Sequence, residues 1–265
     1  AKLVGFVFTR SSAMLAESVH SFADTGNQAL LLLGGRSASR EATREHPFGY
    51  GRERYFWSFV VSVVLFTLGS VFALYEGISK LRDPHELDSP QWAIGILAVA
   101  IVLEGFSFRT AVVAANPLRQ GASWWAYIRN SKAPELPVVL LEDLGAMLGL
   151  VIALIAVGLA LITDNPVWDG GGTVAIGVLL GIIAVILAIE MRSLLIGESA
   201  STRDRDAIIE AIEGAPHVER LIHIKTQHLG PEELLVAAKV AFPPNLSFGD
   251  VAAAIDELEN SVRQR

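Results

Sequence analysis

The stretch "VVLLEDLGAMLGLVIALIAVGLALI", Val138–Ile162, decides the class of fold. It is apolar apart from two adjacent acids, Glu142 and Asp143. A helix of about 20 residues crosses the roughly 30 Å hydrocarbon core of a bilayer, so this stretch is long enough to span a membrane. An acidic residue in such a span costs about 2.5 to 3.5 kcal/mol, so the two acids either serve a function or form a helix-end pair near the membrane interface.

Further apolar stretches extend this pattern to a bundle of six membrane-spanning helices. The first residues, "AKLVGFVF", look like the second half of a span, so we expect the first helix to be truncated. The other spans are expected at residues 14–35, 55–79, 91–115, 138–162 and 168–195. The fold class predicted for residues 1–197 is therefore an α-helical transmembrane domain.

The composition of the chain agrees with a membrane protein. Of its 265 residues, 52% are hydrophobic and 18% are charged, against about 25% charged in an ordinary soluble domain. The chain has no cysteine, which excludes disulfides, thiolate metal ligands and cysteine nucleophiles. Its net charge of -7 and the lack of a basic patch with interleaved aromatics argue against nucleic acid as a partner. Membrane lipid is the expected surrounding.

Residues 198–265 are rich in charge and predict a small cytoplasmic α+β domain. Their pattern indicates a helix, two strands and a second helix, at residues 201–216, 218–230, 233–242 and 247–265. A third strand would have been lost by truncation of the chain. A domain of this size is marginal alone, so we expect it to pair with a second copy in a homodimer.

The basic residues of the loops predict the orientation of the spans. The loops after the second and fourth spans are rich in arginine and lysine and therefore face the cytoplasm. The connection "SKLRDPHELDSP" balances Lys80 and Arg82 with acids, and the connection after the fifth span has no basic residue. Both termini are then cytoplasmic, in a multi-pass protein of a bacterial inner membrane or an equivalent one.

Charged residues at span ends are expected to hold helices in place. Asp169 is at the start of the sixth span, where an acid caps a helix. Arg52 and Arg54, at the start of the third span, are expected to pair with Glu190 or Glu198 and to lock the third span to the sixth.

A stripe of polar side chains on the second span is the candidate site. Glu17, His20, Asp24 and Asn27 are spaced three, four and three residues apart, which places them on one face of a helix. A histidine and an aspartate four residues apart can hold one cation from the same face. The alternative is a structural polar cluster that joins helices, but ionisable groups inside a membrane favour function.

The fifth span is expected to supply the remaining ligands. Glu142 and Asp143 point about 100° apart, so one of them should face the cavity squarely. Gly145 and Gly149 would let another helix approach closely. Imidazole and carboxylate ligands suit Zn²⁺, and also Fe²⁺, Co²⁺ or Mn²⁺. The predicted metal ligands are His20, Asp24, Glu142 and Asp143.

Four motifs together resemble the cation diffusion facilitator family, and most of all its zinc transporter 9 branch. They are "AMLAESVHSFADTGNQ", "HPFGYGRERY", "LLEDLGAMLG" and "LLIGES", and the resemblance covers essentially the whole chain. It implies a homodimeric antiporter that moves divalent metal, zinc foremost, out of the cytosol in exchange for protons. No organic cofactor is implied.

The resemblance also implies which residues form the transport site. The family carries a four-residue motif on the second span and another on the fifth. The first falls on His20 and Asp24. In the second, the closing acid falls on Asp143, but the opening position is Val139, which cannot ligate, and this leaves Glu142 as the substitute.

Accessory sites of the family are reduced in this sequence. The loop motif retains His46, while Tyr50 stands where a second histidine is often found. The histidines of the tail do not fall at the ligating positions of some relatives, so no tail cluster is predicted. Glu104 in the fourth span is either a proton carrier or a partner of Arg109, and Glu17 and Asn27 are further candidates for the pathway or for proton coupling.

The residues also predict a mechanism. Metal binds only deprotonated ligands, so loading the site releases protons, and a histidine such as His20 changes charge near neutral pH. The helices would rock around a site at the midplane of the bilayer. Two alternatives stay open: a metal-responsive scaffold or receptor without transport, and an intramembrane metal-dependent hydrolase. The chain lacks HExxH and a nucleophile beside a base, so we do not expect an enzyme.

Overall fold

The structure, a computed structural model, describes residues 2–84 and 90–264. It forms two compact units, Ala1–Arg192 and Ser193–Arg265. The domain boundary predicted after residue 197 falls one residue beyond the last helix of the apolar pattern, which ends at Ile196.

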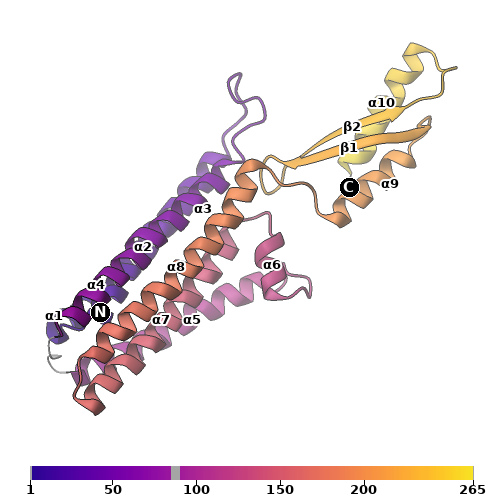
Figure 1. The fold of residues 1–265 in the computed structure, drawn as a ribbon. Coiled ribbons are helices and arrows are strands. Elements are labelled where there is room, and N and C mark those ends of the chain that lie inside the picture. Colours follow the sequence, from indigo (N-terminus) through magenta and orange to yellow (C-terminus); the bar gives the residue numbers. More distant parts are fainter. Residues whose placement is uncertain (1, 85–89, 265) are drawn as a thin grey trace. The chain divides into compact units, whose positions relative to one another are not determined.

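The first unit is built from long helices that run alongside one another (Figure 1). The stretch Glu53–Arg82 is one continuous helical segment that contains a π-helical part, η1. The elements of this unit are α1 Lys2–Thr9, α2 Ser12–Ala38, α3 Glu53–Val64, η1 Leu65–Val71, α4 Phe72–Arg82, α5 Pro90–Ala115, α6 Trp124–Asn130, α7 Glu135–Thr163 and α8 Val167–Ile196.

Within the described residues, four helical stretches are long and apolar enough to cross a membrane. They are Glu53–Arg82, Gln91–Ala115, Glu135–Thr163 and Val167–Ile196. Helix α2 has 27 residues, also enough to cross a bilayer at about 1.5 Å per residue, but it carries the polar stripe. The predicted fold class is confirmed: an α-helical membrane protein with a small C-terminal α+β part.

Glycines let the helices of the first unit approach closely. A Cβ atom on Gly77 of α4 would lie 2.7 Å from the backbone nitrogen of Val174 in α8. A Cβ atom on Gly177 of α8 would lie 2.8 Å from Leu74 of α4. Small residues permit such contacts in membrane bundles, where van der Waals packing drives helix association. Helix α8 is therefore held tightly against α4.

The outer surface of this unit carries large apolar side chains. Phe22 of α2, Phe106 of α5 and Ile162 of α7 are 79%, 65% and 81% exposed. Such a surface suits lipid, because hydrocarbon solvates apolar side chains while the helices satisfy their own backbone hydrogen bonds. The inner faces of α2 and α7 contact each other, and α5 packs on α7.

The second unit contains a β-hairpin and two helices, in the predicted order. Helix α9 spans Thr202–Glu213, strand β1 Arg220–His228, strand β2 Leu234–Ala241 and helix α10 Phe248–Arg263. The strands are antiparallel, with Ile224 opposite Ala238. Among the described residues the sheet has two strands.

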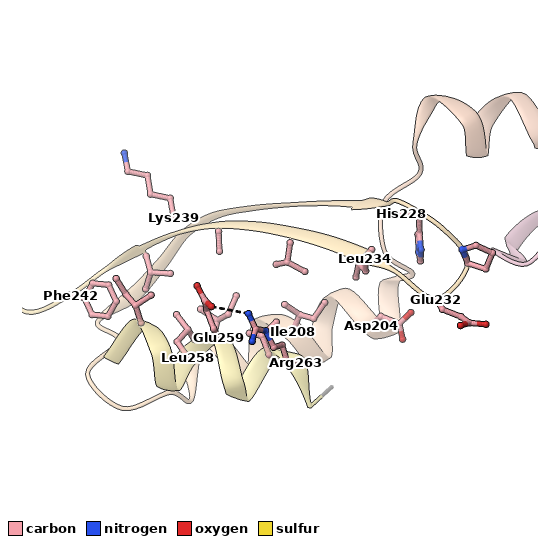
Figure 2. Close-up of a pocket in the computed structure, with 17 residues that line it drawn as sticks. Asp204, Ile208, His228, Glu232, Leu234, Lys239, Phe242, Leu258, Glu259 and Arg263 are labelled. Carbon is pink, nitrogen blue, oxygen red and sulfur yellow. Dashed lines mark hydrogen bonds and ion pairs between the residues drawn. The ribbon is translucent and has the colours of Figure 1, made fainter. Parts of the chain in front are cut away.

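A pocket of about 980 Å³ opens between the helices and the hairpin of this unit (Figure 2). Apolar side chains of both helices and of β2 line it, among them Ile208, Leu234 and Leu258. Ile208 and Leu258 also belong to the buried core of the unit. This pocket is a feature of the second unit, whereas the predicted metal ligands all belong to the first.

The structure shows partners for several of the charged residues expected to hold helices in place. Arg54 pairs with Glu135 of α7, with its Nε 3.3 Å from Oε1 of Glu135. This ion pair joins the third span to α7, and the expected pairing of Arg52 and Arg54 with Glu190 or Glu198 stays a prediction. Glu190 pairs with Arg129 of α6, with its Oε1 3.5 Å from Nε of Arg129. Asp169 lies in the first turn of α8, and its carboxylate accepts a hydrogen bond from the backbone N–H of Ser12 in the first turn of α2.

Candidate metal centre

The polar stripe of α2 lies inside the helical unit. Glu17, His20 and Asn27 are completely buried, and the side chain of Asp24 is 19% exposed. Nδ1 of His20 lies 3.4 Å from Oδ1 of Asp24, one helical turn away. Because α2 continues without interruption from Ser12 to Ala38, the spacing of the stripe translates directly into one face.

Helix α7 brings Glu142 to this face. The carboxylate of Glu142 is 3% exposed and accepts a short hydrogen bond from Nδ2 of Asn27. The Glu142 side chain also lies within hydrogen-bonding reach of Asp24. Three residues of the stripe and the adjoining acid of α7 thus form a continuous polar interface between two otherwise apolar helices.

Glu17 fills a gap that a glycine of α7 leaves open. A Cβ atom on Gly149 would lie 2.5 Å from Oε1 of Glu17. Any larger residue at position 149 would therefore occupy the place of this carboxylate. The sequence predicted that Glu17 belongs to the stripe, and the structure shows that Gly149 of α7 is its neighbour.

Asp143 faces the other side of α7. Its Oδ2 accepts a hydrogen bond of 3.1 Å from Oγ of Ser107 in α5, and Glu104, one turn earlier in α5, is a neighbouring charge. Val139, one turn before Asp143, packs on an apolar cluster formed by α5, α6 and α7. The two positions that the family motif occupies on α7 thus lie toward α5, while Glu142 lies toward α2.

Among the predicted ligands, His20 pairs with Asp24, Glu142 lies next to Asp24, and Asp143 lies apart from these three toward α5. Across residues 2–84 and 90–264, no group of three or more His, Asp or Glu side chains is placed to hold one metal ion. His46 lies in an exposed loop, where its ring packs edge to face on the ring of Tyr50, with 4.7 Å between the two ring centroids. His228, at the end of β1, is buried, and its backbone N–H donates to the carbonyl of Glu198.

Sequence reasoning missed two buried polar features. Lys80 was assigned to a loop, but it lies in α4 and is 3% exposed. Asp169 forms a network with Ser11, Ser12 and Thr173, all of them buried. The signal for this network was faint: helix α2 begins with two serines and has no acid in its own first turn.

A bundle of long apolar helices, with imidazole and carboxylate groups buried between two of them, is typical of an integral membrane protein. The cation efflux transmembrane domain matches residues 1–196 of the chain. The chain therefore belongs to the cation efflux family, the cation diffusion facilitators, which confirms the resemblance seen in the sequence.

Relatives whose names describe metal transport or metal tolerance agree with this family. The chain is 36% identical to the proton-coupled zinc antiporter SLC30A9, mitochondrial, of Xenopus laevis over 246 residues, 91% of this chain and 44% of that protein. Its human counterpart is 34% identical over 246 residues, 91% of this chain and 43% of that protein. Metal tolerance protein C4 of Arabidopsis thaliana is 31% identical over 241 residues, which are 90% of this chain and 53% of that protein. The chain spans about half the length of these relatives.

Proposed function

We propose that this protein transports divalent metal cations, with zinc as the foremost substrate, in exchange for protons. The observation that carries the proposal is the burial of His20, Asp24 and Glu142 at the interface of α2 and α7 in an apolar helical unit. Membership in the cation efflux family supports it, and relatives named as proton-coupled zinc antiporters favour zinc among the candidate metals. Fe²⁺, Mn²⁺ and Co²⁺ share the same ligand preference.

The chemistry of exchange follows from the ligands. A metal ion binds a neutral imidazole and ionised carboxylates, so binding releases the protons that these groups carry. His20 and Asp24 approach the ion from one helix and Glu142 from the other. Because no three of the described His, Asp and Glu side chains are placed to hold one ion in this arrangement, binding must draw the two helix faces together. Release on the opposite side then follows protonation and rocking of the helices around the site.

The two acids of α7 have different proposed roles. Glu142 is the ligand from α7, because it faces Asp24 and Asn27 of α2. Asp143 lies beside Ser107 and near Glu104, so we assign it and Glu104 to the pathway of ions or protons along α5. In this proposal Glu142 takes the ligand position that Val139 cannot fill.

The remaining features of the proposal are the topology and the assembly. The proposed topology has both termini in the cytoplasm or in the corresponding compartment, and the excess of basic residues in two loops supports it. The relatives named as zinc antiporters are mitochondrial proteins, so an organelle membrane is an alternative to a bacterial inner membrane. A homodimer surrounded by lipid is the proposed assembly.

Transport in liposomes tests the function. The purified protein is reconstituted in liposomes with a pH gradient, and uptake of zinc, iron and manganese is followed with a fluorescent indicator. We expect uptake by the parent protein, its loss in His20→Ala, Asp24→Ala and Glu142→Ala, and near-normal uptake in Val139→Ala.

The outcomes separate the alternatives. Metal binding without uptake by the parent would favour a metal-responsive scaffold or receptor. Metal-dependent cleavage of a peptide substrate in the same vesicles would favour an intramembrane hydrolase. Loss of uptake in Asp143→Ala with normal uptake in Glu142→Ala would reverse the roles assigned to the two acids.

A further inference from the structure

The start of α2 is attached to α8 by a buried carboxylate. Oδ1 of Asp169 accepts a 2.6 Å hydrogen bond from Oγ of Ser11, and Oδ2 accepts hydrogen bonds of 2.9 Å from both N and Oγ of Ser12. Oγ of Ser11 in turn accepts from N of Met14. Asp169 thus satisfies one backbone donor of the first turn of α2 directly, and a second through Ser11.

The charge of this carboxylate suits its position. The first turn of a helix leaves backbone N–H groups without intrahelical partners and carries the positive end of the helix dipole. Helix α2 has no acid in its own first turn, so α8 supplies one from 157 residues away. Thr173 lies one turn further along α8. Its Oγ1 is hydrogen-bonded to Oγ of Ser12 at 3.0 Å, which adds a second contact between the helices.

The part of α8 that holds this carboxylate is itself fixed. A Cβ atom on Gly170 would lie 3.2 Å from Leu81 of α4, and one on Gly172 would overlap Ala156 of α7. Asp169 therefore belongs to a closely packed part of the bundle.

The attachment lies close to the candidate metal centre along α2. Glu17 and His20 follow Ser12 by five and eight residues, about 7.5 and 12 Å along the helix axis at 1.5 Å per residue. A rigid helix transmits the position of its first turn over such distances.

We propose that Asp169 is a positioning residue, which holds the start of α2 on α8 and so sets the depth at which Glu17 and His20 meet α7. The effect on metal rests on the proposed transport function, but the attachment itself does not. During transport this end of α2 moves together with α8. Access to the site must then change at the other end of α2 or between other helices.

Two variants separate positioning from helix capping. Asp169→Ala removes both the cap and the attachment. The double variant Ser11→Asp with Asp169→Ala places a carboxylate on the cap residue of α2 itself, which restores the cap but not the link to α8. Asp164→Asn, an exposed acid in the turn between α7 and α8, is the matched control.

Two readouts are compared in the whole chain of 265 residues. The absence of cysteine allows spin labels to be attached at Phe22→Cys on α2 and Val178→Cys on α8, two exposed positions, and the distance between them to be measured by double electron–electron resonance. We expect a broader distance distribution and about tenfold slower zinc uptake in Asp169→Ala. The double variant should recover thermal stability while distance and uptake stay altered, and the control should match the parent.

An unchanged distance distribution in Asp169→Ala would overturn the proposal. Recovery of both the distribution and uptake in the double variant would also overturn it, because capping alone would then explain the contact. If the parent moves no metal, the proposed function fails, and the distance measurement still decides whether Asp169 fixes α2.

Discussion

Replacement of Gly149 by alanine tests whether Glu17 belongs to the transport site. The new Cβ atom would lie 2.5 Å from Oε1 of Glu17, whereas ordinary van der Waals contact begins at 3.4 Å. The carboxylate oxygen must therefore retreat by 0.9 Å, the difference of these two distances. The other near neighbour, Cγ2 of Ile176, would lie at 3.7 Å and need not move.

This movement should lower the rate of zinc uptake but hardly change the free energy of unfolding. The clash involves the end of a flexible side chain, which can rotate away, and alanine is favoured over glycine in a helix by about 0.5 to 1 kcal/mol. We expect the free energy of unfolding to stay within about 1 kcal/mol of the parent. A displacement of about 1 Å in a positioned group can cost up to about 100-fold in rate, so we expect zinc uptake to fall by about 10- to 100-fold.

The assay is the initial rate of zinc uptake into liposomes, combined with thermal unfolding in detergent. Gly158→Ala is the matched control, because it lies on the same helix and a Cβ atom there would meet nothing within 4 Å. In a Glu17→Ala background the clash disappears, so adding Gly149→Ala should change nothing further. Equal uptake by Gly149→Ala and Gly158→Ala would refute a role for Glu17 at the site.

The sequence was sufficient to predict the features that depend on local pattern. Length and apolarity placed the spans, since a helix in hydrocarbon must satisfy its backbone internally and expose apolar side chains. The spacing of Glu17, His20, Asp24 and Asn27 placed them on one face, because helical geometry alone fixes that relation. The cap and turn residues of the second unit likewise indicated its helices and hairpin.

The orientation of α7 could not be predicted in the same way. Helical geometry shows that Glu142 and Asp143 diverge, but not which of them meets α2. That choice depends on how α7 packs between α2 and α5, and therefore on contacts such as Asn27 with Glu142 and Ser107 with Asp143. These pairs are 115 and 36 residues apart in the chain, beyond the range of any local pattern.

Two further features had no usable local signal. The π-helical segment Leu65–Val71 lies inside an apolar run that is equally consistent with a regular α-helix. Asp169 is a good capping residue for its own helix by sequence, and only the tertiary structure reveals that it caps another.

Three further substitutions follow from single contacts. Asn27→Leu removes the donor to Glu142, and we expect zinc affinity, measured by titration of the purified protein, to fall by about 10- to 100-fold. Gly172→Ala would place a methyl group against Cβ of Ala156, which cannot rotate away, and we expect it to lower the free energy of unfolding by about 1 to 3 kcal/mol. Asp250→Asn should weaken the start of α10 in a pH-dependent manner, measured by hydrogen exchange.

The substitution at Gly172 has a matched control, and the first two substitutions have outcomes that would contradict them. A Cβ atom on Gly171 would meet nothing within 4 Å, so Gly171→Ala should unfold like the parent. If Gly172→Ala did the same, α7 and α8 would not be in the close contact described. Unchanged zinc affinity in Asn27→Leu, with normal affinity also in Glu142→Ala, would exclude the interface of α2 and α7 as the metal site.

The pH dependence of α10 follows from its first turn. Ser247 caps the helix, and its hydroxyl and then its backbone N–H donate to the Asp250 carboxylate, which lowers the pKa of Asp250 below its usual value. A carboxyl group with a lowered folded pKa stabilises the fold above its unfolded pKa of about 3.9, and this contribution is lost as the pH falls through the folded value. In the parent, the exchange protection of the first turn should therefore decrease below about pH 4. Above about pH 4 this protection should be greater in the parent than in Asp250→Asn. The control is Asp256→Asn, which changes an exposed acid later in α10 and should behave like the parent. Equal protection of the parent and Asp250→Asn at neutral pH would show that the capping box does not hold the start of α10.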